Sequence, residues 1–106
     1  MPTLKRHPLV RADLQSAYAW YEDELPGLGG EFREEFSRVC RKLGQGPLLY
    51  AVRFASVRRL NLDRFPYGIF YIVKPDESRV LAVLHASRDT EYILAERRRT
   101  FSAGQF

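Results

Sequence analysis

The chain has 106 residues, 45% of them hydrophobic, so we expect residues 1–106 to form a single domain around one core. Its one cysteine, Cys40, excludes an internal disulfide, and its apolar runs are too short and too interrupted by charge to span a bilayer. The first eight residues carry charge and proline where a secretory signal needs an apolar run. We therefore expect a cytoplasmic protein without a membrane partner.

The net charge is +4, with 17 Lys and Arg against 13 Asp and Glu. Only Lys5, Lys42 and Lys74 are lysines, so arginine, whose planar fork suits bidentate contacts with phosphate or carboxylate, supplies most of the positive charge. Such a surface attracts RNA, DNA or an acidic protein segment, and charge alone does not choose among them. In the alternative interpretation, the arginines only keep a small domain soluble and bind no particular partner.

The N-terminal part of the chain predicts a strand and two helices. Residues 3–7 are short and extended, and Pro8 suits the first turn of a helix. Apolar residues then recur at spacings of three and four: Val10, Leu14, Ala17, Tyr18, Tyr21 and Leu25. Proline and glycines in residues 25–30 disfavour continuation of this helix. A second apolar stripe follows before the break at residues 44–47: Phe32, Phe36, Val39, Cys40 and Leu43. The two helices are expected to pack as an antiparallel hairpin.

Residues 57–84 predict three strands. Polar and apolar side chains alternate over residues 59–63, so this strand has one solvent-facing side, which carries Arg59. Residues 67–73 and 80–84 are apolar at both parities, which is typical of central strands. The intervening residues 74–78, Lys-Pro-Asp-Glu-Ser, favour a turn, so these two strands are expected to form a hairpin.

The last element is predicted to be a short helix. Asp89 can cap its N-terminus, and three consecutive arginines, residues 97–99, suit a helix C-terminus. The tail, residues 100–106, has no periodicity, so we expect it to be disordered unless a partner orders it. The order of elements predicts an α+β fold in which an N-terminal helical hairpin packs on a small antiparallel β-sheet, followed by a short C-terminal helix.

Few residues of the sequence suggest a catalytic, metal-binding or cofactor-binding site. The chain contains no His-Glu-x-x-His, no paired-cysteine motif and no Gly-x-x-x-x-Gly-Lys loop, so we expect neither a metal nor a cofactor. His85 and Arg88 lie three residues apart where a strand meets a helix, and Arg59 on a neighbouring strand is expected to approach them. Such a group suits metal-free RNA cleavage, in which arginine holds the phosphate and histidine moves a proton. A histidine bonded to backbone and an arginine paired with an acid explain the same spacing.

Two further features have alternative interpretations. Residues 27–30, Gly-Leu-Gly-Gly, resemble a phosphate loop but join two helices instead of following a strand, which favours a turn. Trp20 lies about a hundred degrees from the first apolar stripe. It either fills the groove toward the second helix or, if exposed, anchors a partner. Tryptophan and arginine dominate interface energies, so Trp20, Arg97 and Arg98 are the candidate partner-binding residues.

Three segments together resemble the RelE/ParE toxin family over nearly the whole chain. Residues 7–14, His-Pro-Leu-Val-Arg-Ala-Asp-Leu, followed by Ala-Trp-Tyr-Glu at residues 19–22, are similar to the opening helix of the family. Residues 59–71 match an arginine, a spacer and a Phe-Pro-Tyr-x-x-x-Tyr strand. Residues 83–89 resemble the family's His-x-x-Arg-Asp strand end.

This resemblance implies a toxin that an antitoxin neutralises by wrapping a segment over it, as a toxin–antitoxin hetero-oligomer. RelE-like members are ribosome-dependent mRNA endonucleases, whereas ParE-like members inhibit DNA gyrase and need no catalytic residue. The nuclease branch commonly has an arginine after the strand tyrosine, where this chain has Gly68 after Tyr67, and an acid–base tyrosine late in the sequence, which Tyr92 matches loosely. The aromatic strand and the His-x-x-Arg ending are more similar to the ParE branch.

Three hypotheses follow from this resemblance. The first is a ParE-like gyrase inhibitor with a cognate antitoxin. The second is a RelE-like endoribonuclease acting on the ribosome and mRNA, in which Arg59, His85 and Arg88 surround the phosphate and Tyr92 donates a proton. The third is an inactive family member that acts only as a binding module.

Overall fold

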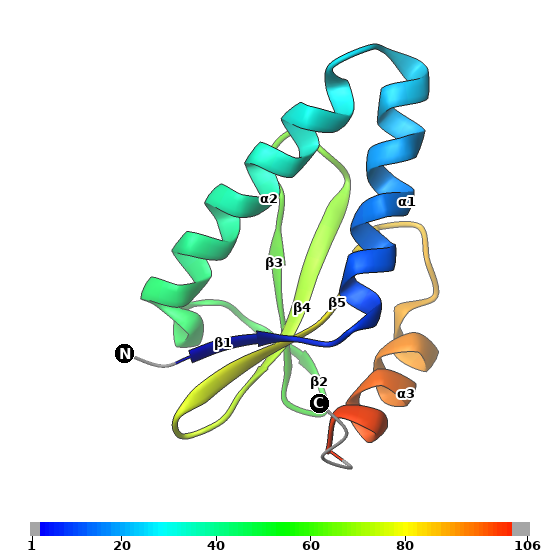
Figure 1. The fold of residues 1–106 in the computed structure, drawn as a ribbon. Helices are drawn as coiled ribbons and strands as arrows, with labels where there is room; N and C mark the ends of the chain where they lie inside the picture. Colours follow the sequence, from blue (N-terminus) through cyan, green and yellow to red (C-terminus); the bar gives the residue numbers. More distant parts are fainter. Residues whose placement is uncertain (1–2, 103–106) are drawn as a thin grey trace.

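The computed structural model describes residues 3–102 (Figure 1). The chain forms a five-stranded sheet and three helices in the order β1 (Thr3–Arg6), α1 (Leu9–Glu24), α2 (Leu28–Gln45), a 3₁₀ turn (Pro47–Leu49), β2 (Val52–Phe54), β3 (Val57–Asn61), β4 (Tyr67–Val73), β5 (Glu77–His85) and α3 (Thr90–Ser102). This confirms the predicted α+β architecture. None of the helices in residues 3–102 is long and apolar enough to cross a membrane.

The sheet has the strand order β1-β5-β4-β3-β2 and separates two apolar clusters. On one side α1 and α2 cover Ile69, Tyr71 and Val83, and on the other side α3 covers Phe70 and Leu84. The predicted β4–β5 hairpin is present, with the backbone N–H of Lys74 donating to the carbonyl of Glu77 at 2.7 Å. β1 joins the other edge of β5 in parallel, so the sheet is mixed. A parallel pair needs a crossover connection, and the rest of the sheet and the helical hairpin provide it.

The helical hairpin is as predicted, but its turn is shorter. All five apolar residues of the second stripe are buried on α2. α2 begins at Leu28, so Gly29 and Gly30 are helical, whereas we predicted that residues 25–30 interrupt the helices. The carboxylate of Glu22 explains this difference, because it accepts the backbone N–H groups of Gly27 and Gly29 at 2.9 and 3.0 Å. These bonds satisfy amides that would otherwise have no partner at a helix N-terminus.

One short strand was not predicted, and the predicted start of the C-terminal tail was wrong. The strand β2 was missed because three residues carry no periodicity, and only its pairing with β3 defines it. The predicted disordered tail began at residue 100, but α3 continues to Ser102. The ring of Phe101 causes this extension, since it is 2% exposed and packs edge-on against the ring of His7 at 5.6 Å. Residues 103–106 of the predicted tail lie outside the described residues.

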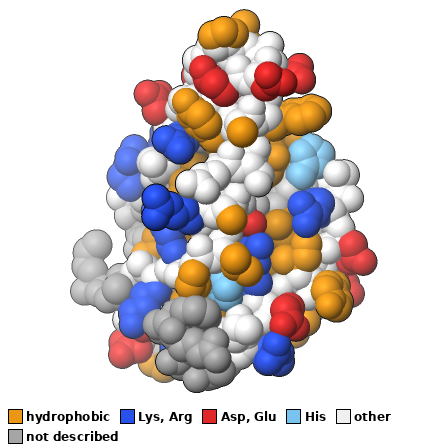
Figure 2. Space-filling view, turned by 45° about the vertical axis from the view of Figure 1, so that its right-hand side comes forward, with side chains coloured by type: hydrophobic (Ala, Val, Ile, Leu, Met, Phe, Trp, Pro, Cys, Tyr) orange, Lys and Arg blue, Asp and Glu red, His pale blue; other side chains and the backbone are white. Residues whose placement is uncertain are grey.

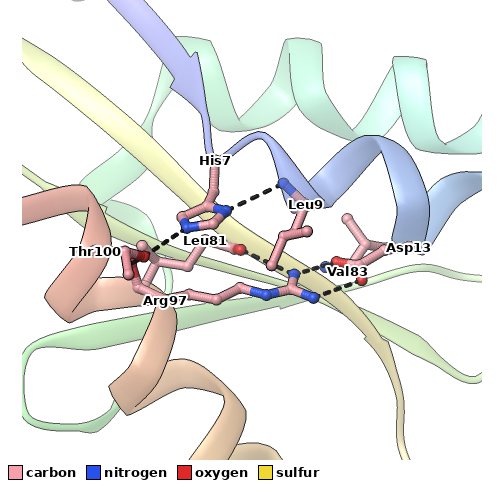
Figure 3. Close-up of polar contacts among 7 residues, drawn as sticks. All are labelled: His7, Leu9, Asp13, Leu81, Val83, Arg97 and Thr100. Carbon is pink, nitrogen blue, oxygen red and sulfur yellow. Dashed lines mark hydrogen bonds and ion pairs between the residues drawn. The ribbon is translucent and has the colours of Figure 1, made fainter. Parts of the chain in front are cut away.

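A polar network joins α1, β5 and α3 between the two ends of the chain (Figure 3). The guanidinium of Arg97 donates to both carboxylate oxygens of Asp13, at 2.5 and 2.8 Å, and to the carbonyl of Leu81 at 3.1 Å. The backbone N–H of Val83 donates to the same carboxylate at 2.9 Å. The side chains of Arg97 and Asp13 are 12% and 9% exposed, so this ion pair lies inside the protein.

His7 extends the network to the last turn of α3. Its Nδ1 accepts the backbone N–H of Leu9 at 3.1 Å, so Nε2 carries the proton of a neutral ring and donates to the hydroxyl of Thr100 at 2.8 Å. Burial, together with the positive charge of Arg97, lowers the pKa of His7 below its ordinary value of 6.5, and Asp13 opposes this shift. The folded protein therefore holds His7 neutral.

This lowered pKa makes stability depend on pH. The unfolded chain binds a proton at His7 as the pH falls below 6.5, whereas the folded chain does so only at a lower pH. The free energy of unfolding is therefore expected to fall as the pH drops from 6.5 toward the pKa of His7 in the folded protein. Above pH 6.5 the neutral ring of His7 makes its full contribution to stability. Urea unfolding of the native protein and of His7→Gln across this interval measures it. The slope should be smaller in His7→Gln than in the native protein; equal slopes in the two proteins contradict the expectation.

Candidate functional site

The ends of β4 and β5 carry a group of aromatic side chains on the face covered by the helical hairpin. Tyr67 lies opposite His85 in the β4–β5 pairing, and their rings meet edge to face at 5.2 Å. Phe65 and Phe32 pack against Tyr21 at 4.8 and 5.6 Å. The Phe-Pro-Tyr segment thus places two rings on the hairpin, and His85 forms the outer border of the group.

This aromatic group contains three ionisable side chains, those of Tyr67, Tyr21 and His85. Burial raises the pKa of Tyr67, although the nearby Arg88 lowers it, and burial also raises the pKa of Tyr21. Both phenols are therefore protonated at neutral pH and are poor bases. Nδ1 of His85 accepts the backbone N–H of Ser87 at 3.0 Å and lies 2.8 Å from the hydroxyl of the same residue. His85 therefore matches the alternative interpretation of a histidine that is hydrogen-bonded to backbone.

Arg59 does not reach this group. It lies opposite Phe70 in the β3–β4 pairing, and Phe70 belongs to the cluster under α3. Residues directly opposite in an antiparallel pair point to the same face, so Arg59 projects from the α3 face and His85 from the hairpin face. The predicted approach of Arg59 to His85 is therefore not found.

The guanidinium of Arg59 instead lies over Gly68. Its Nε donates to the side-chain carbonyl of Asn61 at 2.5 Å, and its Cζ lies 5.0 Å from the centre of the Phe70 ring. A Cβ at residue 68 would stand 2.6 Å from Nε of Arg59. The glycine after Tyr67 thus leaves the space that this guanidinium occupies.

The other two members of the predicted cluster are exposed. The backbone N–H of Arg88 donates to the carbonyl of His85 at 3.0 Å, which closes a tight turn after β5. Its side chain is close enough to affect the pKa of Tyr67. Tyr92, on the first turn of α3, is 76% exposed. The structure therefore brings His85 and Arg88 together with Tyr67 and leaves out Arg59.

The three candidate partner-binding residues differ in accessibility. Trp20 is 62% exposed, so it does not fill the groove toward α2. Arg98 donates to the carbonyl of Ala55, and to the hydroxyl of Ser56 at 2.9 Å, and so holds the turn between β2 and β3. Arg97 is committed to Asp13 inside the protein, and its placement does not support a role in binding a partner.

No group of three or more His, Cys, Asp or Glu within residues 3–102 is arranged to hold a metal ion.

A model of the family described as "ParE toxin of type II toxin-antitoxin system, parDE" matches residues 4–90. The chain belongs to the ParE toxin family.

Two kinds of relative agree with this ParE membership. Toxin ParE2 of Mycobacterium tuberculosis, from strains CDC 1551 / Oshkosh and ATCC 25618 / H37Rv, is 28% identical over 94 residues, which cover 88% of this chain and 90% of the relative. A solved structure described as the chromosomal ParDE TA system from P. aeruginosa has a TM-score of 0.72 and 25% identity, and covers 80% of this chain and 96% of that one. The predicted resemblance to the ParE branch is confirmed.

Sequence reasoning missed two acidic residues that organise this ParE-family fold. Glu35 is 3% exposed and accepts the backbone N–H groups of Asp63 and Arg64 at 2.6 and 3.0 Å, which ties α2 to the turn between β3 and β4. Asp13 is the partner of Arg97. Both carboxylates follow an apolar residue of their helix stripe, Phe32 or Val10, at a spacing of three. A charge on the buried face of a helix is the signal that could have found them.

Proposed function

We propose that this ParE-family protein is a toxin that inhibits DNA gyrase and that a cognate antitoxin neutralises it. One observation carries the choice of target: the sheet separates Arg59 from His85. In the group predicted for metal-free cleavage of RNA, Arg59 and Arg88 surround the phosphate beside His85, and the structure keeps only Arg88 near His85. Here Arg59 lies on one face over Gly68, while His85 lies on the other, bonded to the backbone of Ser87.

The remaining polar groups near His85 also favour a binding role. Tyr67 and Tyr21 are protonated at neutral pH because burial raises their pKa values. Tyr92 is exposed on α3, so its side chain is accessible to a partner protein. A protein that acts by holding a cleaved enzyme–DNA state needs shape and charge at its surface, and no reacting side chain of its own.

An arginine-lined hollow between α1, α2 and β1 supports an antitoxin partner. Arg6, Arg11 and Arg33 border it, and Leu14 and Phe36 supply its apolar lining. The guanidinium of Arg6 lies 5.2 Å from the centre of the Phe36 ring. Within residues 3–102 none of these three arginines has a carboxylate within ion-pair distance, so the hollow suits an acidic segment with apolar anchors. The relative from P. aeruginosa is described as part of a ParDE system, and such a system includes an antitoxin.

The gyrase assay tests the proposed target. Purified protein added to gyrase and relaxed plasmid is expected to block supercoiling and to accumulate linear DNA once gyrase is denatured. The product of a neighbouring reading frame, when it encodes a DNA-binding segment and a disordered tail, should restore supercoiling. Intact supercoiling at a large excess of toxin would rule out gyrase inhibition.

Two further assays identify the other hypotheses if gyrase is not inhibited. Codon-positioned cuts in translated messages, detected by primer extension and lost in Arg88→Ala, would identify a ribosome-dependent endoribonuclease. Unhindered growth when the chain is induced without an antitoxin would identify an inactive binding module.

A further inference from the structure

The closed end of the helical hairpin exposes two large apolar side chains. Trp20 and Leu25 are 62% and 56% exposed. Trp20, Asp23 and Glu24 lie at spacings of three and four on α1, so they share one face of its last turn. We call Trp20, Asp23, Glu24 and Leu25 the tip surface. Figure 1 shows this end of the hairpin standing clear of the sheet.

The tip surface is held in one conformation by the turn behind it. Glu22 accepts two backbone N–H groups of the turn, and Gly27 has the positive φ of 92° that this turn requires. Gly29 packs against Tyr18 so closely that a Cβ would lie 2.8 Å from its carbonyl oxygen. The guanidinium of Arg33 also packs on Tyr18, with its Cζ 4.2 Å from the ring centre. A surface already ordered in the free protein loses little conformational entropy when it binds.

The charge of this region is opposite to that of the whole chain. No lysine or arginine occurs between Arg11 and Arg33, in a chain whose net charge is +4. Among the carboxylates of this stretch, Asp13 and Glu31 form ion pairs and Glu22 binds backbone amides. Within residues 3–102, Asp23 and Glu24 have no cation within ion-pair distance. Figure 2 shows acidic and hydrophobic side chains together at the projecting end, with Lys and Arg lower on the same face.

We propose that the tip surface docks on a basic protein surface with a hydrophobic pocket that receives the indole of Trp20, and that this basic surface belongs to the enzyme that the toxin inhibits. The inference rests on the proposed function and names the part of the toxin that contacts the target. Asp23 and Glu24 repel phosphate, so nucleic acid is not the occupant. An exposed tryptophan with a charged rim has the composition of a binding hot spot.

Trp20 is the single tryptophan of the chain, which makes the contact directly measurable. Protein labelled with 5-fluorotryptophan gives one ¹⁹F signal, and this signal is expected to shift or broaden when purified gyrase is added. Trp20→Ala is expected to weaken gyrase inhibition by about tenfold or more. The double variant Asp23→Lys, Glu24→Lys should weaken it as well and should reduce its dependence on salt.

Matched controls separate this surface from general effects. Leu48→Ala removes a side chain of similar exposure, 65%, from the 3₁₀ turn that follows α2, and should inhibit as the native protein does. The double variant Glu34→Lys, Asp76→Lys makes the same change in net charge at two exposed sites elsewhere and should also be unaffected. All variants should keep the native melting temperature, since the replaced side chains are exposed.

The outcomes distinguish this inference from the proposed function. If the native protein inhibits gyrase and Trp20→Ala inhibits it equally well, the docking inference is overturned and the proposed function stands. If the native protein does not inhibit gyrase, both are overturned. Self-association of the native protein in light scattering that Trp20→Ala abolishes would show that a second copy occupies the tip, and would overturn the inference as well.

Discussion

Arg97→Ala is expected to lower the free energy of unfolding by about 3–5 kcal/mol, the range for a buried ion pair that loses one partner. Asp13 would remain inside the protein, where the backbone N–H of Val83 still donates to its carboxylate but the guanidinium charge is gone. The carbonyl of Leu81 would also lose a donor. Urea unfolding followed by circular dichroism measures the loss.

Two comparisons make this expectation specific to the buried pair. Arg99 forms an ion pair with Glu96, but these side chains are 69% and 53% exposed. Arg99→Ala should therefore leave the free energy of unfolding nearly unchanged. In the double variant Asp13→Leu, Arg97→Met, apolar groups replace both charges and much of the stability should return. A loss below about 1 kcal/mol for Arg97→Ala would contradict an essential role of this pair.

Gly29→Ala is expected to destabilise the protein by about 1–3 kcal/mol through overpacking, although alanine is the better helix former. A Cβ at residue 29 would lie 2.8 Å from both the ring and the backbone carbonyl oxygen of Tyr18. The ring can rotate, but the carbonyl belongs to α1 and moves only with the helix. The substitution therefore pushes the two helices apart, and urea unfolding measures the cost.

Gly30 is the matched control for Gly29. It is the next residue of α2, and a Cβ there would meet nothing within 4 Å. Gly30→Ala should stabilise the protein by about 0.5–1 kcal/mol, the intrinsic advantage of alanine in a helix. If both substitutions stabilise the protein, the close packing of α1 and α2 at Gly29 is wrong.

The sequence predicted those elements whose residues repeat a pattern. α2 has its apolar residues at helical spacing, and all five predicted positions are buried. β4 and β5 are apolar at both parities because helices cover both faces of the sheet. The parallel pairing of β1 with β5 could not be predicted, since Thr3 and Glu77 carry no local signal of each other. Phe101 likewise extends α3 by a contact with His7.

The candidate site was predicted in part. His85 and Arg88 are neighbours along the chain, so their proximity follows from the sequence. Arg59 was correctly placed on the polar side of its strand, but a change of register by one residue exchanges the two faces, and one strand alone does not fix its register. Only the pairing of Arg59 with Phe70 shows that it faces α3. The Asp13–Arg97 pair joins residues 84 positions apart, beyond the reach of any periodicity.

The long separation of Asp13 from Arg97 bears on how the toxin is made. During synthesis from the N-terminus, β1 has no strand to join until β5 has emerged, and α1 has no cation for Asp13 until most of α3 has followed. Contacts between such distant residues form slowly, because the chain between them must first be ordered. A nascent or truncated chain therefore lacks the native surface, and the cell meets a folded toxin only after nearly the whole chain has been translated.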